Sequence, residues 1–141
     1  MPESARVISV AVSDSVPCPD CGAPAEWHGV QVLLGDDSLR WDTETVCGEC
    51  GSATAACGTE LPGEMRERLL AEHGATELRL GSSVDRVAVM RVLRRSLGLG
   101  LGEARAVRDR GYGGTLPEVE LLARRLRVVG VGAVAVAGAG R

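Results

Sequence analysis

The chain has 141 residues, which is enough for one ordinary domain or two small ones. Nearly half of the residues are apolar, but there is no Phe, one Tyr and two Trp, so any core must consist mainly of Val, Leu and Ala. No segment reaches the ~18 apolar residues of a membrane-spanning helix, and the first residues lack the basic start of a signal peptide. The composition therefore excludes a membrane-spanning chain and predicts a soluble, cytoplasmic protein.

Charge is divided sharply along the chain. Residues 1–60 carry ten acidic and two basic side chains, residues 61–81 carry four and three, and residues 82–141 carry five and eleven. The first segment is thus strongly acidic and the last strongly basic, and the two could attract each other or face different partners. Because phosphate binding needs clustered cations, the first segment argues against a nucleic-acid partner.

Two matched Cys-x-x-Cys motifs dominate the acidic segment. Cys18 and Cys21 lie in the run CPDCG, Cys47 and Cys50 lie in CGECG, and a glycine follows each second cysteine. Two cysteines three positions apart in a tight turn can direct both sulfurs to one metal. Two such turns complete the four-thiolate tetrahedron that structural zinc prefers. Two disulfides or a redox pair are the alternative, but the spacing and the trailing glycines favour a closed Zn²⁺ site.

The segments around the cysteines have the alternation of β-strands. Residues 7–12, 25–34 and 38–46 are predicted to be strands, with a turn at 35–37. Trp27 and Trp41 are the large side chains available to cover them. We therefore predict that residues 1–58 form a zinc ribbon in which Zn²⁺ is structural. Such sites contribute on the order of 10–16 kcal/mol in small peptides, so chelation is expected to unfold this segment.

The other reactive side chains form no recognisable catalytic set. Cys57 has no partner cysteine and is predicted to be a small buried or idle thiol. His28 and His73 are predicted to be ordinary polar residues, because four cysteines complete the zinc site without them. Catalysis needs a nucleophile, a base and a group that orients them. Without such a set, we expect no enzymatic activity and no small-molecule substrate.

The rest of the chain is predicted to contain a connector and a second small domain. Pro62 and Gly74 suit the two ends of a short helix in a connector at residues 59–75. Residues 76–141 are then predicted to contain a strand at 76–80, a first helix from Asp85 to Leu97, a second helix that residues 105–110 complete, a third helix from Pro117, and a strand at 133–137. The order β-α-α-β-α-β fits a small antiparallel sheet covered by helices, so the predicted fold class is α+β.

The first two of these helices are joined by the glycine-rich run GLGLG. It has no Gly-Lys-Ser or Gly-Lys-Thr ending and follows no hydrophobic strand, so it indicates a helix–helix turn and not a phosphate loop. Gly98 is predicted to close the first helix in the left-handed conformation, and Gly100 and Gly102 to allow close helix contact. Leu99 and Leu101 are predicted to point into the core. In the third helix, the leucines are predicted to face inward and the arginines outward.

The first helix also carries apolar residues on two sides. Its core face is predicted to consist of Ala88, Val89, Val92, Leu93 and Leu97. Val87 and Met90 lie on the other side, between Arg91 and Arg94. Apolar side chains set among cations indicate a docking surface. The alternative is that they are singly exposed or pack under a neighbouring loop, which is common.

The run VAVMRVLRRSLGLGLGEAR resembles the C-terminal domain of the bacterial ribosomal stalk protein of the large subunit, the seven/twelve type. The family pattern is a helix of the type aliphatic-Ala-aliphatic-aliphatic-basic, then Thr-Gly-Leu-Gly-Leu, then Lys-Glu-Ala-Lys. The match is ungapped over residues 85–105 and looser over 116–136. The resemblance implies the same β-α-α-β-α-β arrangement, and a face that contacts translational GTPases. The matching positions here are Arg86, Val87, Met90, Arg91, Arg94 and Arg105.

The chain departs from the stalk family in three ways. Leu97 stands where the family usually has Thr, and Gly102 where it usually has Lys. The family's N-terminal dimerisation helices and flexible hinge have no counterpart, so the chain is not expected to join the ribosome as an ordinary stalk subunit. The stalk domain also resembles protease adaptors in fold, but the residues that hold a substrate's N-terminus in those adaptors are not identifiable here.

Three functional classes follow from the sequence. The first is a non-catalytic zinc-binding protein-interaction module that engages a translational GTPase or a ribosome-associated factor, which the retained cations favour. The second is an adaptor or immunity-type protein that binds and blocks a non-ribosomal partner, which the acidic ribbon favours. The third and least favoured is a nucleic-acid-binding zinc-ribbon regulator, which the charge opposes.

Overall fold

The computed structural model describes residues 6–81 and 85–138, and it shows a mixed α+β chain. The chain divides into two compact units, residues 1–72 and residues 73–141, which are described separately below. The expectation that no targeting signal begins the chain falls partly on residues 1–5, outside the described residues. Among the described helices, none has the length and hydrophobicity needed to cross a membrane.

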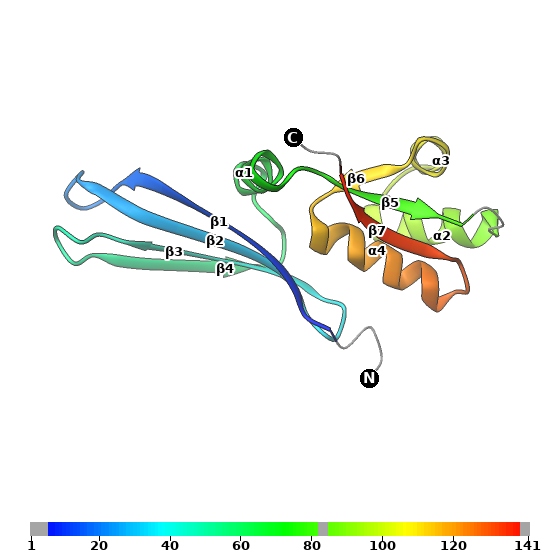
Figure 1. Cartoon of the computed structure of the whole chain (residues 1–141), viewed down its shortest axis with the longest axis horizontal. Helices are drawn as coiled ribbons and strands as arrows, with labels where there is room; N and C mark the ends of the chain where they lie inside the picture. Colours follow the sequence, from blue (N-terminus) through cyan, green and yellow to red (C-terminus); the bar gives the residue numbers. More distant parts are fainter. Residues whose placement is uncertain (1–5, 82–84, 139–141) are drawn as a thin grey trace. The chain divides into compact units, whose positions relative to one another are not determined.

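The first unit is a four-stranded antiparallel sheet with one helix. The strands follow one another in the order β1-β2-β3-β4, and helix α1 comes after the last (Figure 1). Their bounds are β1 Ile8–Pro17, β2 Pro24–Leu33, β3 Leu39–Val46, β4 Ala53–Gly58 and α1 Gly63–His73. Strand β4 was not predicted. Its sequence ATAACG has no alternation of large apolar and polar side chains, and its pairing with β3 defines it.

Helix α1 packs on one face of this sheet. Met65 and Leu69 of α1 are buried against Val12 of β1, and Trp27 and Trp41 are packed against the same cluster. Arg68 lies over the Trp27 ring, with its guanidinium carbon 5.0 Å from the ring centroid. The helix that the sequence assigned to a connector therefore contributes to the core of the first unit.

The second unit contains a three-stranded antiparallel sheet and three helices. Its elements are β5 Thr76–Leu80, α2 Arg86–Leu97, α3 Leu101–Arg110, β6 Tyr112–Gly114, α4 Leu116–Val128 and β7 Ala133–Ala137. The strands have the order β6-β5-β7 (Figure 1). The predicted strands at 76–80 and 133–137 are confirmed. The second strand of the predicted β-α-α-β-α-β order, counted along the chain, is the short β6.

Capping residues explain where the helices of the second unit begin and end. The Asp85 carboxylate accepts hydrogen bonds from the backbone N–H groups of Val87 and Ala88, over 3.0 and 3.2 Å. Gly98 ends α2 in the left-handed region at φ 67°, as predicted. At the start of α4, Thr115 and Glu118 bond each other's backbone N–H groups and so form a capping box.

The core of the second unit lies between the sheet and its helices. Val89, Val92 and Leu93 of α2 are buried, and Ala88 and Leu97 pack against them, which confirms the predicted core face. Leu99 also packs against this core. The prediction for Leu101 is wrong, because it is 52% exposed in the first turn of α3.

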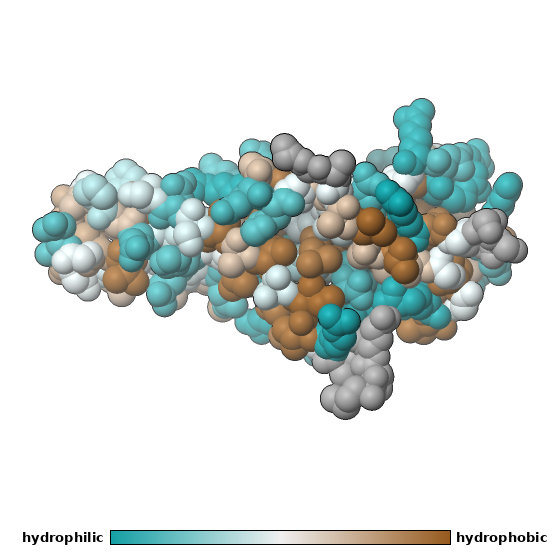
Figure 2. Space-filling model, in the orientation of Figure 1, coloured by the Kyte–Doolittle hydropathy of each residue, from teal (hydrophilic) through white to brown (hydrophobic). Residues whose placement is uncertain are grey.

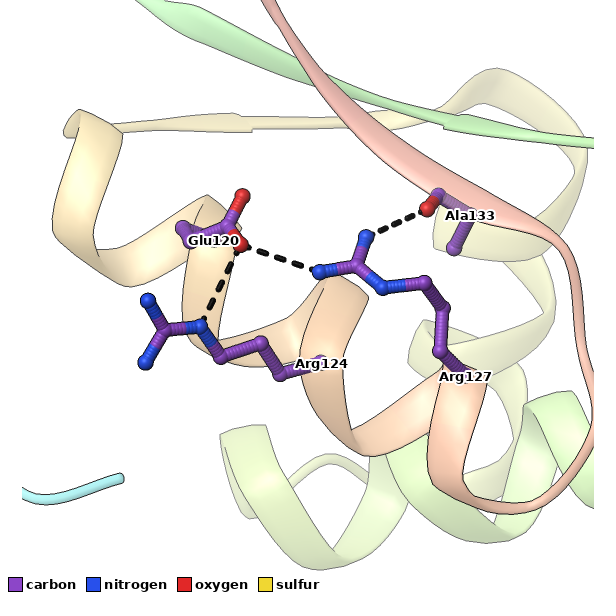
Figure 3. Close-up of polar contacts among 4 residues, drawn as sticks. All are labelled: Glu120, Arg124, Arg127 and Ala133. Atoms are coloured by element: carbon purple, nitrogen blue, oxygen red, sulfur yellow. Dashed lines mark hydrogen bonds and ion pairs between the residues drawn. The ribbon is translucent and has the colours of Figure 1, made fainter. Parts of the chain in front are cut away.

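Two further predictions for the second unit are wrong. Gly102 makes no close helix contact, since a Cβ there would meet no atom within 4 Å. Arg124 was expected to point outward but is 2% exposed. Its Nε lies 3.3 Å from a Glu120 oxygen, and Arg127 approaches the same oxygen at 3.0 Å (Figure 3). A carboxylate one turn earlier on α4 thus compensates the charge, and helical periodicity alone does not reveal this pairing.

Candidate metal centre and docking face

The two Cys-x-x-Cys motifs occupy two turns at the same end of the first sheet. One motif joins β1 to β2 and the other joins β3 to β4 (Figure 1). The strand ladders stop just before each motif, at the opposed pairs Pro17–Pro24 and Val46–Ala53. Because β2 and β3 are neighbours in the sheet, their pairing brings the two turns together.

The two turns have the same backbone geometry. The N–H groups of Cys18 and Cys47 each donate to the carbonyl five residues on, over 2.7 and 2.9 Å. Gly22 and Gly51 donate back to the carbonyls of these cysteines, over 2.9 and 3.0 Å. Both glycines have left-handed φ angles, 78° and 76°, which other residues rarely adopt. The glycines after the second cysteines are therefore required by the turn.

The four cysteine sulfurs form one compact group. The Sγ atoms of Cys18 and Cys50 are 3.7 Å apart, and those of Cys21 and Cys47 are 3.6 Å apart. All four lie within 4.8 Å of one another. Tetrahedral coordination with metal–sulfur bonds of about 2.3 Å implies sulfur–sulfur distances of about 3.8 Å, whereas a disulfide bond is about 2.05 Å. The four predicted residues can therefore hold a single metal ion, and the cysteines form no disulfide.

Burial differs within the group. Cys18 and Cys47, the first cysteines of each turn, are 4% and 1% exposed and pack with Ala25. Cys21 and Cys50 are exposed. The group therefore lies at the end of the sheet, with one side against the strands and one side at the surface.

Hydrogen bonding gives the thiols of this group different pKa values. Bonds from the backbone at Cys21 and then Asp20 lower the pKa of Cys18 to about 7. A backbone bond at Ser52 lowers the pKa of Cys50, but its bond with Cys18, burial and the other cysteines together raise it to about 12. A metal cation at the centre would favour thiolates throughout and release protons.

The second candidate site is a shallow groove on α2 and α3. Its volume is about 810 Å³. It is lined by Arg86, Val87, Met90, Arg91, Arg94, Arg95, Gly98, Leu99, Leu101 and Arg108, and this set is called the α2–α3 groove below. Five of the six residues predicted for partner binding line it. The sixth, Arg105, is exposed on α3 but does not line it.

The groove combines an apolar floor with unpaired cations. Val87 is 66% exposed, and with Leu101 it leaves apolar surface open to solvent. Arg86, Arg91, Arg94 and Arg95 make no ion pair with any acidic side chain of the described residues. The charge of the groove is therefore largely unneutralised within the described chain.

One carboxylate lies at the margin of the groove. Arg108 pairs with Asp109 at 2.9 Å. This hydrogen bond, with the nearby charges of Arg86 and Arg105, holds the pKa of Asp109 below its usual value. Arg105 thus contributes charge near the groove without lining it.

Sequence reasoning missed five lining residues, namely Arg95, Gly98, Leu99, Leu101 and Arg108. Arg95 is adjacent to Arg94, and its charge was a usable signal. Leu99 and Leu101 were predicted to point into the core. Arg108 enters the groove from a different helix, and only the packing of α3 on α2 brings it there.

The remaining candidate residues lie apart from both sites. The prediction that Cys57 is small and buried or idle is corrected in one respect. Its side chain is exposed on β4, and Nη2 of Arg40 lies 3.9 Å from its sulfur. His28 is exposed on β2 with its Nδ1 2.8 Å from the Ser13 hydroxyl. His73 lies at the C-terminal end of α1.

Comparison with known proteins adds no relative from which a function could be carried over. No family model matches the chain, and searches of the curated proteins and of the solved structures find no match either.

Proposed function

We propose that the chain is a non-catalytic zinc-binding protein-interaction module linked to translation. In this proposal the α2–α3 groove docks a translational GTPase or a related ribosome-associated factor. The observation that carries the proposal is the set of four unpaired arginines around an exposed apolar floor. Arginine and large apolar side chains are the types that dominate protein–protein binding energy.

Zinc is the metal that best fits the four-cysteine group. Thiolate ligands in a tetrahedral set are typical of structural zinc sites, and the sulfur–sulfur distances of 3.6 and 3.7 Å suit a bond length of about 2.3 Å. Four protein ligands leave no open coordination position for a substrate. We therefore assign the metal the role of holding the ends of the four strands together.

The chemistry of the groove specifies its partner. The partner surface needs an apolar centre to cover Val87 and Leu101, surrounded by carboxylates that face the arginines. The resemblance of residues 85–105 to the ribosomal stalk domain supports a translational GTPase as the protein that carries this surface. The β-α-α-β-α-β order of the second unit is consistent with that resemblance.

An adaptor or immunity-type protein that blocks a non-ribosomal partner is the second candidate. It is favoured by the charge of residues 1–60, with ten acidic and two basic side chains, because such a segment would be repelled by ribosomal RNA. The same charge makes a nucleic-acid-binding regulator the weakest of the three.

Capture experiments with the zinc-loaded full chain separate these functions. Purified ribosomes and purified translational GTPases are offered to the immobilised wild type, to Arg91→Glu/Arg94→Glu, and to Arg40→Glu/Arg110→Glu. The last variant has the same charge change at exposed arginines outside the groove. The proposal predicts capture by the wild type and the control, and none by the first variant.

Other outcomes select the other candidates. Failure to retain either probe, with a stoichiometric non-ribosomal protein recovered from native cells, would select the adaptor. Salt-sensitive binding to generic DNA would select the regulator. If Arg91→Glu/Arg94→Glu captures the partner as well as the wild type does, the docking site lies elsewhere.

A further inference from the structure

The second sheet ends on an apolar strand. β7 has the sequence AVAVA and is one edge of the sheet of order β6-β5-β7. Natural edge strands usually carry charges, prolines or bulges that prevent pairing with another strand. β7 contains no charge and no proline, and its register with β5 is unbroken. Its own sequence therefore does nothing to block a further strand.

The hydrogen bonds between β7 and β5 show which backbone N–H and C=O groups of β7 are not bonded to β5. Gly138 donates to the Ala75 carbonyl and Gly81 donates to the Gly132 carbonyl, each over 2.9 Å, and both pairs extend the β5–β7 register. Because bonded and non-bonded pairs alternate in antiparallel sheets, the even-numbered residues of β7 bond to β5. The N–H and C=O groups that point away from β5 belong to Ala133, Ala135 and Ala137.

One of these outward groups is already engaged. Nη1 of Arg127 donates to the Ala133 carbonyl over 2.6 Å, while Nη2 of the same side chain bonds Glu120 (Figure 3). Arg127 thus covers the first residue of the edge. For Ala135 and Ala137, no partner on the outward side is found among the described residues. Within the described part of the chain, the outward backbone groups of these two residues are therefore unpaired.

The side chains beside this edge are also apolar. Ala133 and Ala135 pack into the core of the second unit. Val134 and Val136 point to the other face of the sheet, where Val134 is 53% exposed. Figure 2 shows hydrophobic surface along β7. A strand that paired with the edge would cover these valines as well as the free backbone groups.

We propose that β7 pairs antiparallel with β7 of a second copy, so that the two three-stranded sheets become one continuous sheet. We choose a second copy because an uncharged strand can pair with itself about a twofold axis without charge repulsion, and about Ala135 the sequence AVAVA sets Ala opposite Ala and Val opposite Val. A twofold axis there sets Ala135 against its own equivalent, with both backbone bonds exchanged, and sets Val134 against the second copy's Val136. No charge on either strand opposes this contact.

The expected dimer is weak. A pair of five-residue strands buries less surface than the ~1,600 Å² of a standard protein interface. Association is therefore expected only at micromolar concentrations or above. The inference does not depend on the proposed docking function, because β7 contributes no residue to the α2–α3 groove.

Sedimentation velocity of the zinc-loaded full chain, from low micromolar to millimolar concentration, tests the proposal. The wild type is expected to pass from monomer to dimer. Val134→Glu is expected to weaken the dimer by at least about tenfold, because it sets a carboxylate in the valine contact. In the monomer this carboxylate faces Arg79 across the β5–β7 pair, so the fold is expected to persist. Val128→Glu is the matched control, since Val128 is 80% exposed at the end of α4.

Two further measurements keep the test decisive. Ala135→Pro removes one outward N–H, which an edge strand tolerates, and is expected to abolish dimerisation. In the wild type, amide exchange at Ala135 and Ala137 should slow as concentration rises, a readout that needs no variant. A monomer at every concentration would overturn the proposal. So would a dimer that Val134→Glu and Ala135→Pro weaken no more than Val128→Glu does.

Discussion

Removing the metal is expected to unfold the first unit and leave the second folded. Both tryptophans of the chain, Trp27 and Trp41, pack beside α1 in the first unit. Tryptophan fluorescence therefore reports on the first unit alone. The second unit contains α2, α3 and α4 and none of the four cysteines, so most of the helical circular dichroism signal comes from it.

The size of the effect follows from the small core of the first unit. Three buried apolar side chains, Val12, Met65 and Leu69, form its main cluster. Burial of each contributes roughly 1.5–3 kcal/mol, whereas a structural zinc site contributes on the order of 10–16 kcal/mol. The apolar cluster is therefore too small to replace the metal.

The assay follows tryptophan emission and circular dichroism while a chelator removes the metal, with loss of metal verified by elemental analysis. We expect a red shift of tryptophan emission, with the helical signal largely retained. Cys47→Ser should reproduce this result, and Cys57→Ser should not, since Cys57 lies outside the sulfur cluster. A metal-free chain with unchanged tryptophan emission and unchanged strand signal would refute the reasoning.

Three other predictions concern the turns, the protons of the metal site and α4. Gly51→Ala should weaken metal binding by about 1 kcal/mol, because the φ angle of 76° at this position strains any residue other than glycine. Gly48→Ala is the control and should not weaken binding, because Gly48 has open space around it and no left-handed φ angle. A competitive chelator titration measures the metal affinity of both variants. Metal affinity should fall as pH falls, because the four thiols must lose their protons to bind the metal; the same titration would show a constant affinity across pH if this is wrong. Glu120→Gln should destabilise the second unit by about 1–3 kcal/mol, because it removes the carboxylate that two arginines share. Urea unfolding measures this loss. A loss below about 0.5 kcal/mol, which is the usual effect of a surface substitution, would contradict the prediction.

Local sequence signals were sufficient to predict the structure where a single residue type determines the backbone conformation. The Cys-x-x-Cys-Gly turns were predictable because two sulfurs and a left-handed glycine constrain each turn independently of the rest of the chain. The end of α2 was predictable from Gly98 for the same reason. The basic and apolar residues of α2 were identified from helical periodicity, although their role as a docking site stays a prediction.

Long-range packing explains what the sequence did not predict. β4 has only small side chains, and its strand conformation depends on pairing with β3. The position of α1 depends on contacts between Met65 and Val12, which lie far apart in the chain. Arg108 reaches the α2–α3 groove, and Arg124 pairs with Glu120, through side-chain arrangements that no sequence period encodes.

The central claim, that the arginines of the α2–α3 groove bind a translational GTPase, is tested most directly by calorimetric titration of a purified translational GTPase with the zinc-loaded full chain. Arg91 and Arg94 are exposed and form no ion pair with described residues, so their reversal should leave stability within about 0.5 kcal/mol. Each reversal replaces an attraction by a repulsion, and together they should cost about 2–4 kcal/mol of binding, or roughly 30- to 1,000-fold in Kd. The account predicts this loss for Arg91→Glu/Arg94→Glu and wild-type affinity for Arg40→Glu/Arg110→Glu. Equal affinities for the two variants, or no binding by the wild type, would contradict it.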